Sequence, residues 1–149
     1  MEPFDPIKYI VGASEILDDG EWPTFHDAIV YSLNFWRGDI RSEDDVWVCP
    51  SIDASVELVA LQFPFVVDLR FHDCDHIHMQ GFNYDNSIYG LSFSIEDRGF
   101  YADGVTPLPP SINVTFGYGD GSTQPLLLTF KCSRIEVLKR RDVPDPPCH

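Results

Sequence analysis

Two segments of the chain combine histidine with carboxylates in a way that could support acid–base chemistry. The tripeptide Phe-His-Asp occurs at residues 25–27 and again at residues 71–73. A histidine oriented by a carboxylate is one part of a catalytic constellation, and a nucleophile or a metal ion has to complete it. A metal-dependent enzyme is therefore one alternative, and it requires residues from separate segments to converge in one pocket. Those residues are His26, Asp27, His72, Asp73, His76 and His78.

The second segment also carries a row of potential zinc ligands at alternate positions. In an unbroken strand, His72, Cys74, His76 and His78 would all project from the same face. Neutral histidine and cysteine thiolate both bind zinc well. Same-face neighbours on a strand lie about 7 Å apart, however, so a tetrahedral ion cannot take four ligands from one extended row. At most, His76 and His78 could act together with one remote ligand.

We favour a structural interpretation of this row and expect no bound metal or other cofactor. The pattern indicates a strand that a turn interrupts at residues 73–75. After that turn, Ile77 and Met79 would face the core, whereas the neighbouring histidines would face water. If a metal were bound, its ligands would be His72, His76 and His78.

The first Phe-His-Asp lies in the stretch GEWPTFHDAIV, residues 20–30, which joins a loop to the start of a strand. Its glycine and proline shape the backbone of the loop. Large aromatic side chains usually bury most of their surface, so we expect Trp22 and Phe25 to close one end of a core. His26 and Asp27 would then stand at a strand entrance, where a structural or interface role is more common than catalysis. We therefore expect that the protein is not an enzyme.

The elements that must position these residues are mostly strands. Alternating apolar and polar residues, separated by turns, predict a mainly β fold. We expect an antiparallel sheet or a two-layer β-sandwich of roughly eight strands, with at most one or two short helical turns near the N-terminus. In residues 65–72, the odd positions would face the core and the even positions would be largely wet. The expected strands cover residues 28–36, 46–49, 51–63, 65–72, 88–95, 112–118, 126–132 and 134–139.

The length of the chain indicates a single domain that spans residues 1–149. A chain of this size can bury a core without metal or disulfide staples. We expect an extended or helical lead-in at residues 1–19, a β core at residues 20–140 and a proline-rich tail at residues 141–149.

The N-terminus carries acids and prolines rather than the pattern of a signal peptide. No apolar run approaches the ~20 residues that a membrane span requires. We therefore expect a soluble cytoplasmic protein whose cysteines are free thiols in a reducing compartment. These cysteines are Cys49, Cys74, Cys132 and Cys148.

The chain is strongly acidic, with 24 Asp and Glu against 10 Lys and Arg and a formal charge of −14. Such a charge repels nucleic acid and anionic membranes, which excludes both as partners. It also speeds the encounter with a basic protein. Residues 1–53 hold twelve acids and three bases, a local charge of −9, so the acidic excess leans towards the N-terminal third.

We expect the surface that binds a partner to lie in this acidic third, together with the aromatic and His-Asp residues beside it. Two segments contribute to it, residues 15–27 and the charged turn at residues 39–45, and we expect them to lie close together. The candidate residues are Glu15, Asp18, Asp19, Glu21, Trp22, His26, Asp27, Asp39, Glu43, Asp44 and Asp45.

Four blocks of the sequence resemble those of one bacterial protein family. They are W-P-x-F-H-D at residues 22–27, V-x-L-x-F at 67–71, G-F-N-x-x-N-x-I at 81–88 and F-x-C-x-x-I-x-V at 130–137. In this order they resemble the immunity protein 50 family, whose members are inferred to neutralise the toxin domains of polymorphic toxin systems. The matching motif residues are Trp22, Pro23, Phe25, His26, Asp27, Gly81, Phe82, Asn83, Asn86 and Ile88.

The resemblance implies a bacterial protein that neutralises a cognate toxin domain in a tight complex, by covering its active site or by locking an exosite. The acidic charge would suit a toxin that acts on nucleic acid. We expect a monomer or a homodimer, because exposed edge strands allow two copies to pair. A second alternative is a β-sandwich module that binds carbohydrate or a small molecule through exposed Trp22, Trp36 and Trp47.

Overall fold

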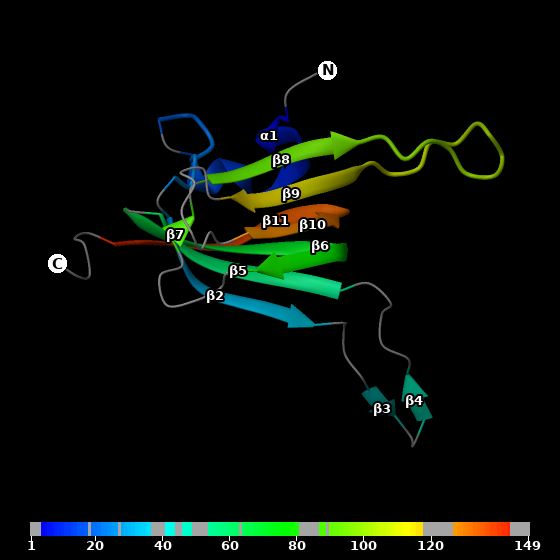
Figure 1. Ribbon diagram of the computed structural model, residues 1–149, viewed down its shortest axis with the longest axis horizontal. Coiled ribbons are helices and arrows are strands. Elements are labelled where there is room, and N and C mark those ends of the chain that lie inside the picture. The colour runs from blue at the N-terminus through cyan, green and yellow to red at the C-terminus, as the bar shows by residue number, and fades with distance from the viewer. Residues whose placement is uncertain are drawn as a thin grey trace.

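Strands dominate the computed structural model of the protein (Figure 1). The expected mainly β fold with short helical turns near the N-terminus is confirmed. Among the described residues, no helix is long and apolar enough to cross a membrane. The structure describes residues 4–17, 19–26, 28–36, 41–43, 46–48, 54–62, 64–80, 87–88, 90–117 and 127–143.

The chain begins with two single helical turns, α1 (Pro6–Tyr9) and the 3₁₀ turn η1 (Ala13–Ile16). Asp5 caps α1, because its side chain accepts a hydrogen bond of 3.1 Å from the backbone N–H of Ile7. The short strand β1 (Ile10–Val11) joins the two turns and pairs in parallel with β11. Gly12 follows at a φ of 79°, where a Cβ atom would lie 3.2 Å from the carbonyl oxygen of Val137. Both its backbone angle and its close approach to β11 favour glycine there.

The strands form one nine-stranded sheet and a separate two-stranded hairpin of β3 and β4. The main path through the sheet runs β7-β2-β5-β6-β10-β9-β8, and β11 lies beside β6 with β1 beyond it. All pairs except β1–β11 are antiparallel. The remaining strands are β2 (Ala28–Trp36), β3 (Arg41–Glu43), β4 (Val46–Val48), β5 (Ala54–Gln62), β6 (Phe65–Gln80), β7 (Ser87–Ile88), β8 (Gly90–Glu96), β9 (Ser111–Gly117), β10 (Leu127–Cys132) and β11 (Arg134–Asp142).

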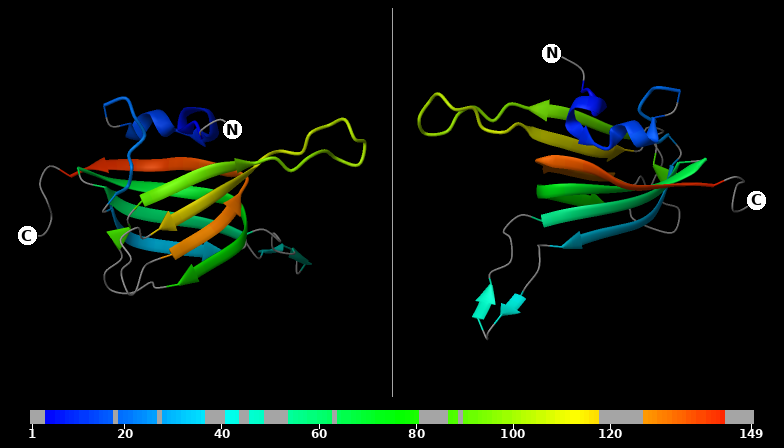
Figure 2. Two further views of the ribbon diagram at one scale, coloured as in Figure 1. Left: turned by 45° about the horizontal axis from the view of Figure 1, so that its top comes forward. Right: turned by 180° about the vertical axis from the view of Figure 1, so that it is seen from behind.

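Strand β6 allows this sheet to curl over itself. One of its edges pairs with β5, while the other edge pairs with β11 along its first half and with β10 along its second half. Asp73 and His76 have positive φ values of 54° and 53°, so the strand bends between its two halves. The sheet consequently has two leaves, one of β2, β5, β6 and β11 and one of β10, β9 and β8, as Figure 2 shows.

The core lies between the two leaves. Phe71 of β6 packs edge-to-face on Phe130 of β10 and on Phe116 of β9, at ring-centroid distances of 5.0 and 6.2 Å. All three rings are at most 2% exposed. The odd positions of residues 65–72 are buried, which confirms the predicted core face, whereas the even positions are half-buried rather than largely wet.

The aromatic residues of the 20–30 loop close one end of this core, as predicted. Phe25 is completely buried, and the ring of Trp22 lies 5.8 Å from it and 6.1 Å from that of Phe93 on β8. Phe4 stacks on Tyr9 and also contacts Phe93, so the N-terminal turns cover the same end. The N-terminal segment and the 20–30 loop thus both pack on Phe93 of β8, although they are far from it in the sequence.

The predicted turn at residues 73–75 is wrong, because β6 continues without a break to Gln80. The prediction that Ile77 and Met79 face the core also fails, since their side chains are 37% and 42% exposed. Strand β5 begins at Ala54, opposite Cys74, so its described residues do not flank the end of β6. The side chains at that end consequently lie at the margin of the core, although the residues alternate as in a buried strand.

Candidate functional site

The most prominent feature of the surface is a projecting hairpin at residues 97–110, which links β8 to β9 and is called the arm here (Figure 1). Backbone hydrogen bonds hold its two sides together, from Tyr101 N–H to Thr106 O at 2.9 Å and from Leu108 N–H to Gly99 O at 2.8 Å. Phe100 and Pro107 form a β-bridge between them. The arm is therefore an ordered extension of the sheet.

Asp103 fixes the tip of the arm. One carboxylate oxygen accepts hydrogen bonds of 2.9 Å from the backbone N–H groups of Val105 and Thr106, and the other accepts one of 2.6 Å from the Thr106 hydroxyl. The side-chain bond to Thr106 and the two backbone bonds lower the pKa of Asp103, since each stabilises the ionised carboxylate. The tip therefore keeps its negative charge at neutral pH.

Three large apolar side chains of the arm face solvent. Phe100 is 60% exposed, Tyr101 50% and Val105 77%. Isolated exposed apolar residues are common, but a cluster on a projecting element is typical of an interaction surface. The arm therefore offers apolar contact area that the fold itself does not use.

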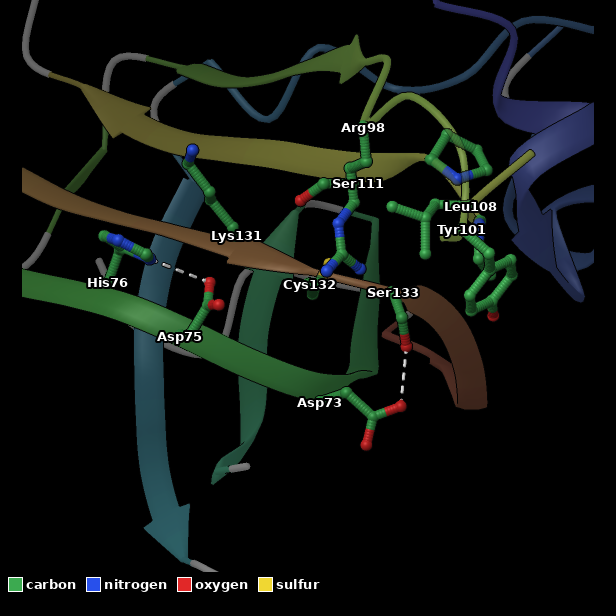
Figure 3. A pocket seen from close by; sticks show the side chains of 12 residues that line it. Asp73, Asp75, His76, Arg98, Tyr101, Leu108, Ser111, Lys131, Cys132 and Ser133 are labelled. Atoms are coloured by element: carbon green, nitrogen blue, oxygen red, sulfur yellow. Dashed lines mark hydrogen bonds and ion pairs between the residues drawn. The ribbon is translucent and has the colours of Figure 1, made fainter. Parts of the chain in front are cut away.

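A groove of about 600 Å³ lies at the base of the arm, between it and the bend of β6, and is called the arm groove here (Figure 3). Asp73, Asp75 and His76 of β6 line one side of it, while Arg98 and Lys131 approach from the other side. Arg98 points into the groove, and its guanidinium forms no hydrogen bond or ion pair with another described residue. The groove thus presents charges of both signs.

Most of the other charged groups in the groove have partners. His76 Nδ1 lies 3.1 Å from Asp75 Oδ1, and Ser133 Oγ donates a hydrogen bond of 2.7 Å to Asp73 Oδ2. Lys131 Nζ lies 2.9 Å from Glu96 Oε2, and its hydrogen bond lowers the pKa of that carboxyl. These pairs are at the surface, where each contributes little to stability but helps to fix the shape of the groove.

The cysteine in the floor of the groove is a poor nucleophile. Cys132 is only 2% exposed, and burial raises its pKa far above the ordinary range of a thiol. The neighbouring Cys74 adds to this shift, and its own thiol donates a hydrogen bond of 3.4 Å to the carbonyl oxygen of Phe71. Thiolates rather than thiols attack electrophiles and bind metals, so burial keeps Cys132 in its less reactive protonated form.

The two Phe-His-Asp tripeptides do not converge. His26 lies just before β2. The start of β2 is level with the start of β6 across the sheet, because Ile29 pairs with Leu61 of β5 and Leu61 pairs with Val66 of β6. His72 lies six residues further along β6, which corresponds to about 20 Å in an extended strand. The geometry required by the metal-dependent alternative is therefore not formed, and Asp27 lies outside the described residues.

The histidines of the β6 row lie apart and in different surroundings. His72 Nε2 lies 3.0 Å from Glu136 Oε1 and 3.2 Å from the guanidinium of Arg134, while His76 and His78 are exposed on the second half of the strand. Among the described residues, no group of three histidine, cysteine or acidic side chains is placed to hold an ion. The bends at Asp73 and His76 remove the regular alternation on which the metal hypothesis depended.

The predicted acidic surface is split by the fold. Glu15, Asp19 and Glu21 are exposed beside the N-terminal turns, whereas the β3–β4 hairpin that contains Glu43 projects from the opposite end of the molecule (Figures 1 and 2). The expectation that the two segments lie close together is therefore wrong. The other acidic candidates, Asp18, Asp27, Asp39, Asp44 and Asp45, lie outside the described residues.

Several motif residues also fall outside the description. Gly81, Phe82, Asn83 and Asn86 are among these residues. Of the residues in the first motif, Pro23 and Phe25 are buried, Trp22 is half-buried and His26 is exposed. The ring of Trp22 packs against those of Phe25 and Phe93 in tilted and edge-on arrangements. The side chains of Trp36 and Trp47 are not described.

The arm is the feature that the sequence analysis missed. Residues 96–104, EDRGFYADG, predict only a turn-rich loop. The available signal was the pair of adjacent aromatic residues, Phe100 and Tyr101, because neighbouring aromatics in a turn-rich loop are not both expected to be buried in the core. The hairpin is held by backbone hydrogen bonds, and its sequence lacks the alternation of apolar and polar residues from which strands are predicted.

Comparison with known proteins adds no relative. No protein-family profile, curated protein or solved structure matches the chain significantly. Function must therefore be argued from the chemistry of the surface and from the sequence blocks described above.

Proposed function

We propose that the protein is a bacterial immunity protein, which binds and neutralises a cognate toxin domain in a tight protein–protein complex and catalyses no reaction itself. The observation that carries this proposal is the acidic excess, 24 acidic against 10 basic residues and a net charge of −14. Such a charge attracts a basic surface and accelerates the encounter with it. The four sequence blocks that resemble the immunity protein 50 family support the same function.

The charge also suggests which kind of toxin is neutralised. A toxin domain that cleaves nucleic acid needs a basic surface to hold the phosphate backbone of its substrate. An acidic protein competes for that surface by electrostatic complementarity. We therefore propose a nuclease-type toxin as the partner and the bacterial cytoplasm as the site of action, with the protein present as a monomer or a homodimer.

The chemistry of the arm groove supports binding rather than catalysis. Its thiol is held in the neutral form, and its carboxylates are engaged by Ser133 and His76. Covalent catalysis requires an activated nucleophile beside a base. A groove with paired charges is better suited to polar contacts around a protein interface.

Co-expression tests the proposed function. Any toxin domain that proves to be encoded directly beside this gene is expressed in a bacterial host, alone or together with the full chain. We expect growth arrest in the first case, restored growth in the second, and a stable complex when the two purified proteins are mixed. An unrelated acidic protein of similar size and charge is the control, and it should not protect.

Two outcomes would contradict the proposal. Toxicity that persists although the full chain is folded and abundant would exclude neutralisation. Stoichiometric zinc, manganese or iron in the purified protein would instead favour the metal-dependent enzyme.

A further inference from the structure

We propose that the arm, residues 97–110, is the element that enters a cleft of the toxin domain, and that this cleft has an apolar floor and a basic rim. This inference rests on the proposed function and specifies the part of the surface that makes the central contact. Its basis is the combination of exposed apolar side chains, a preorganised backbone and fixed negative charge on one projecting element.

The apolar side chains indicate the floor of the cleft. Phe100, Tyr101 and Val105 lie within six residues of one another and are each at least half exposed. Burying apolar surface stabilises a complex by about 25 cal/mol for each Å², and aromatic residues are enriched among the contacts that dominate binding. The arm extends away from the sheet body (Figures 1 and 2), and Phe100 and Val105 remain more exposed than Tyr101, which lines the arm groove.

The hydrogen bonds of the arm indicate that it binds without refolding. The Tyr101–Thr106 and Gly99–Leu108 backbone bonds and the three bonds to Asp103 fix its conformation in the free protein. A loop that is ordered before binding loses less conformational entropy when the complex forms. An apolar hairpin that is already in shape is suited to insertion into a preformed concave surface.

The charges of the arm indicate the rim of the cleft. Asp103 carries a lowered pKa, and the Asp97 carboxylate accepts a hydrogen bond of 2.9 Å from the backbone N–H of Gly99. In the sequence, these two acids stand on either side of Phe100 and Tyr101. Basic side chains at the rim would complement these carboxylates and remain partly solvated, which is the usual arrangement at the edge of an interface.

A second exposed apolar area, on the outer face of the sheet, provides a matched comparison. Tyr31 on β2 is 82% exposed and lines a hollow of about 460 Å³ with Val59, Leu61, Val66 and other residues. Arg141 contributes a positive charge to this hollow, whereas the arm carries two carboxylates, Asp97 and Asp103, and one guanidinium, Arg98. Tyr31 therefore serves as a control residue that is exposed and aromatic but distant from the proposed contact.

Substitutions on the arm test the inference with the neighbouring toxin domain as the probe. We expect Phe100→Ala and Val105→Asp each to weaken binding of the full chain at least tenfold by calorimetry, because each removes apolar contact at the centre of the interface. Tyr31→Ala should change the dissociation constant less than about twofold. All three residues are exposed, so circular dichroism and the unfolding midpoint should stay close to those of the wild type.

The outcomes separate the arm from the proposed function. If the wild type binds and the arm variants bind equally well, the inference that the arm makes the central contact is overturned, while the immunity function stands. If the wild type does not bind the toxin domain, both are overturned. A concentration-dependent homodimer that Val105→Asp abolishes, measured by light scattering, would assign the arm to a second copy and would also overturn the inference.

Discussion

At the scale of single residues, Asp68 shows how the sheet alters the chemistry of a side chain. It lies on the outer face of β6, at a hollow of about 190 Å³ that Lys139 of β11 also lines. Burial and the neighbouring Glu57 of β5 raise the pKa of Asp68 from its ordinary value of 3.8 to about 6, against the opposing effect of Lys139 and Arg70. Alternation placed Asp68 on the face opposite the core, but it did not reveal that this face is half-buried there or that Glu57 of another strand lies beside the carboxyl.

The raised pKa of Asp68 predicts how stability depends on pH. Because the folded state binds the proton more tightly than the unfolded state, this stabilisation is complete below about pH 4 and is lost as the pH rises through 6. Asp68→Asn mimics the protonated carboxyl at every pH. At pH 7.5 we expect the variant to unfold about 2–4 °C higher than the wild type, equivalent to about 1 kcal/mol after allowance for screening by water.

Thermal unfolding between pH 4 and 7.5 checks this expectation, and the difference between the variant and the wild type should disappear near pH 4. Glu21→Gln, a change of the same kind in an exposed loop, is the control. An equal pH dependence in Asp68→Asn and the wild type would contradict the assignment.

At the scale of elements, the sequence predicted the positions of strands better than it predicted which strands lie beside them or where they bend. Residues 28–36 form β2 with the predicted bounds, and the first half of β6 has the predicted core face. The second half of β6 was misassigned because alternation does not reveal where the neighbouring strand β5 begins. At residues 73–75 the sequence predicted a turn that breaks the strand, whereas β6 continues and bends at Asp73 and His76, because a positive φ at a residue other than glycine has no clear sequence signature. The arm was missed because its order depends on turn hydrogen bonds rather than on burial.

The aromatic loop at residues 20–30 supports a prediction about packing. Trp22 joins the loop to β8 through Phe25 and Phe93, so Trp22→Ala removes contacts that link the two leaves. Trp22 is only half-buried, and we expect a loss of about 2–3 kcal/mol, which corresponds to an unfolding midpoint about 4–10 °C lower. His26→Ala, an exposed change in the same loop, should leave the midpoint within about 1 °C. Calorimetry of both variants measures the contrast, and a similar midpoint for Trp22→Ala and the wild type would show that the loop does not close the core.

At the scale of the whole molecule, charge and shape act together. The acidic excess was evident from composition, whereas the fold separates the two segments that sequence analysis had joined into one surface. The N-terminal turns and the β3–β4 hairpin lie at opposite ends, so a single compact partner is more easily guided by the overall field than by one local patch. In the proposed complex, the arm adds the apolar contacts that a long-range field cannot provide.

This division between field and contact predicts different effects of salt on the two rate constants of complex formation. With a charge of −14, the full chain should associate with the toxin domain at least about tenfold more slowly at 500 mM than at 20 mM salt, because ions screen charges beyond a few ångströms. The dissociation rate should change much less, since buried apolar contacts at Phe100 and Val105 are insensitive to salt. Stopped-flow measurements across this range separate the two constants. An association rate that does not respond to salt would remove electrostatic attraction as the basis of partner choice.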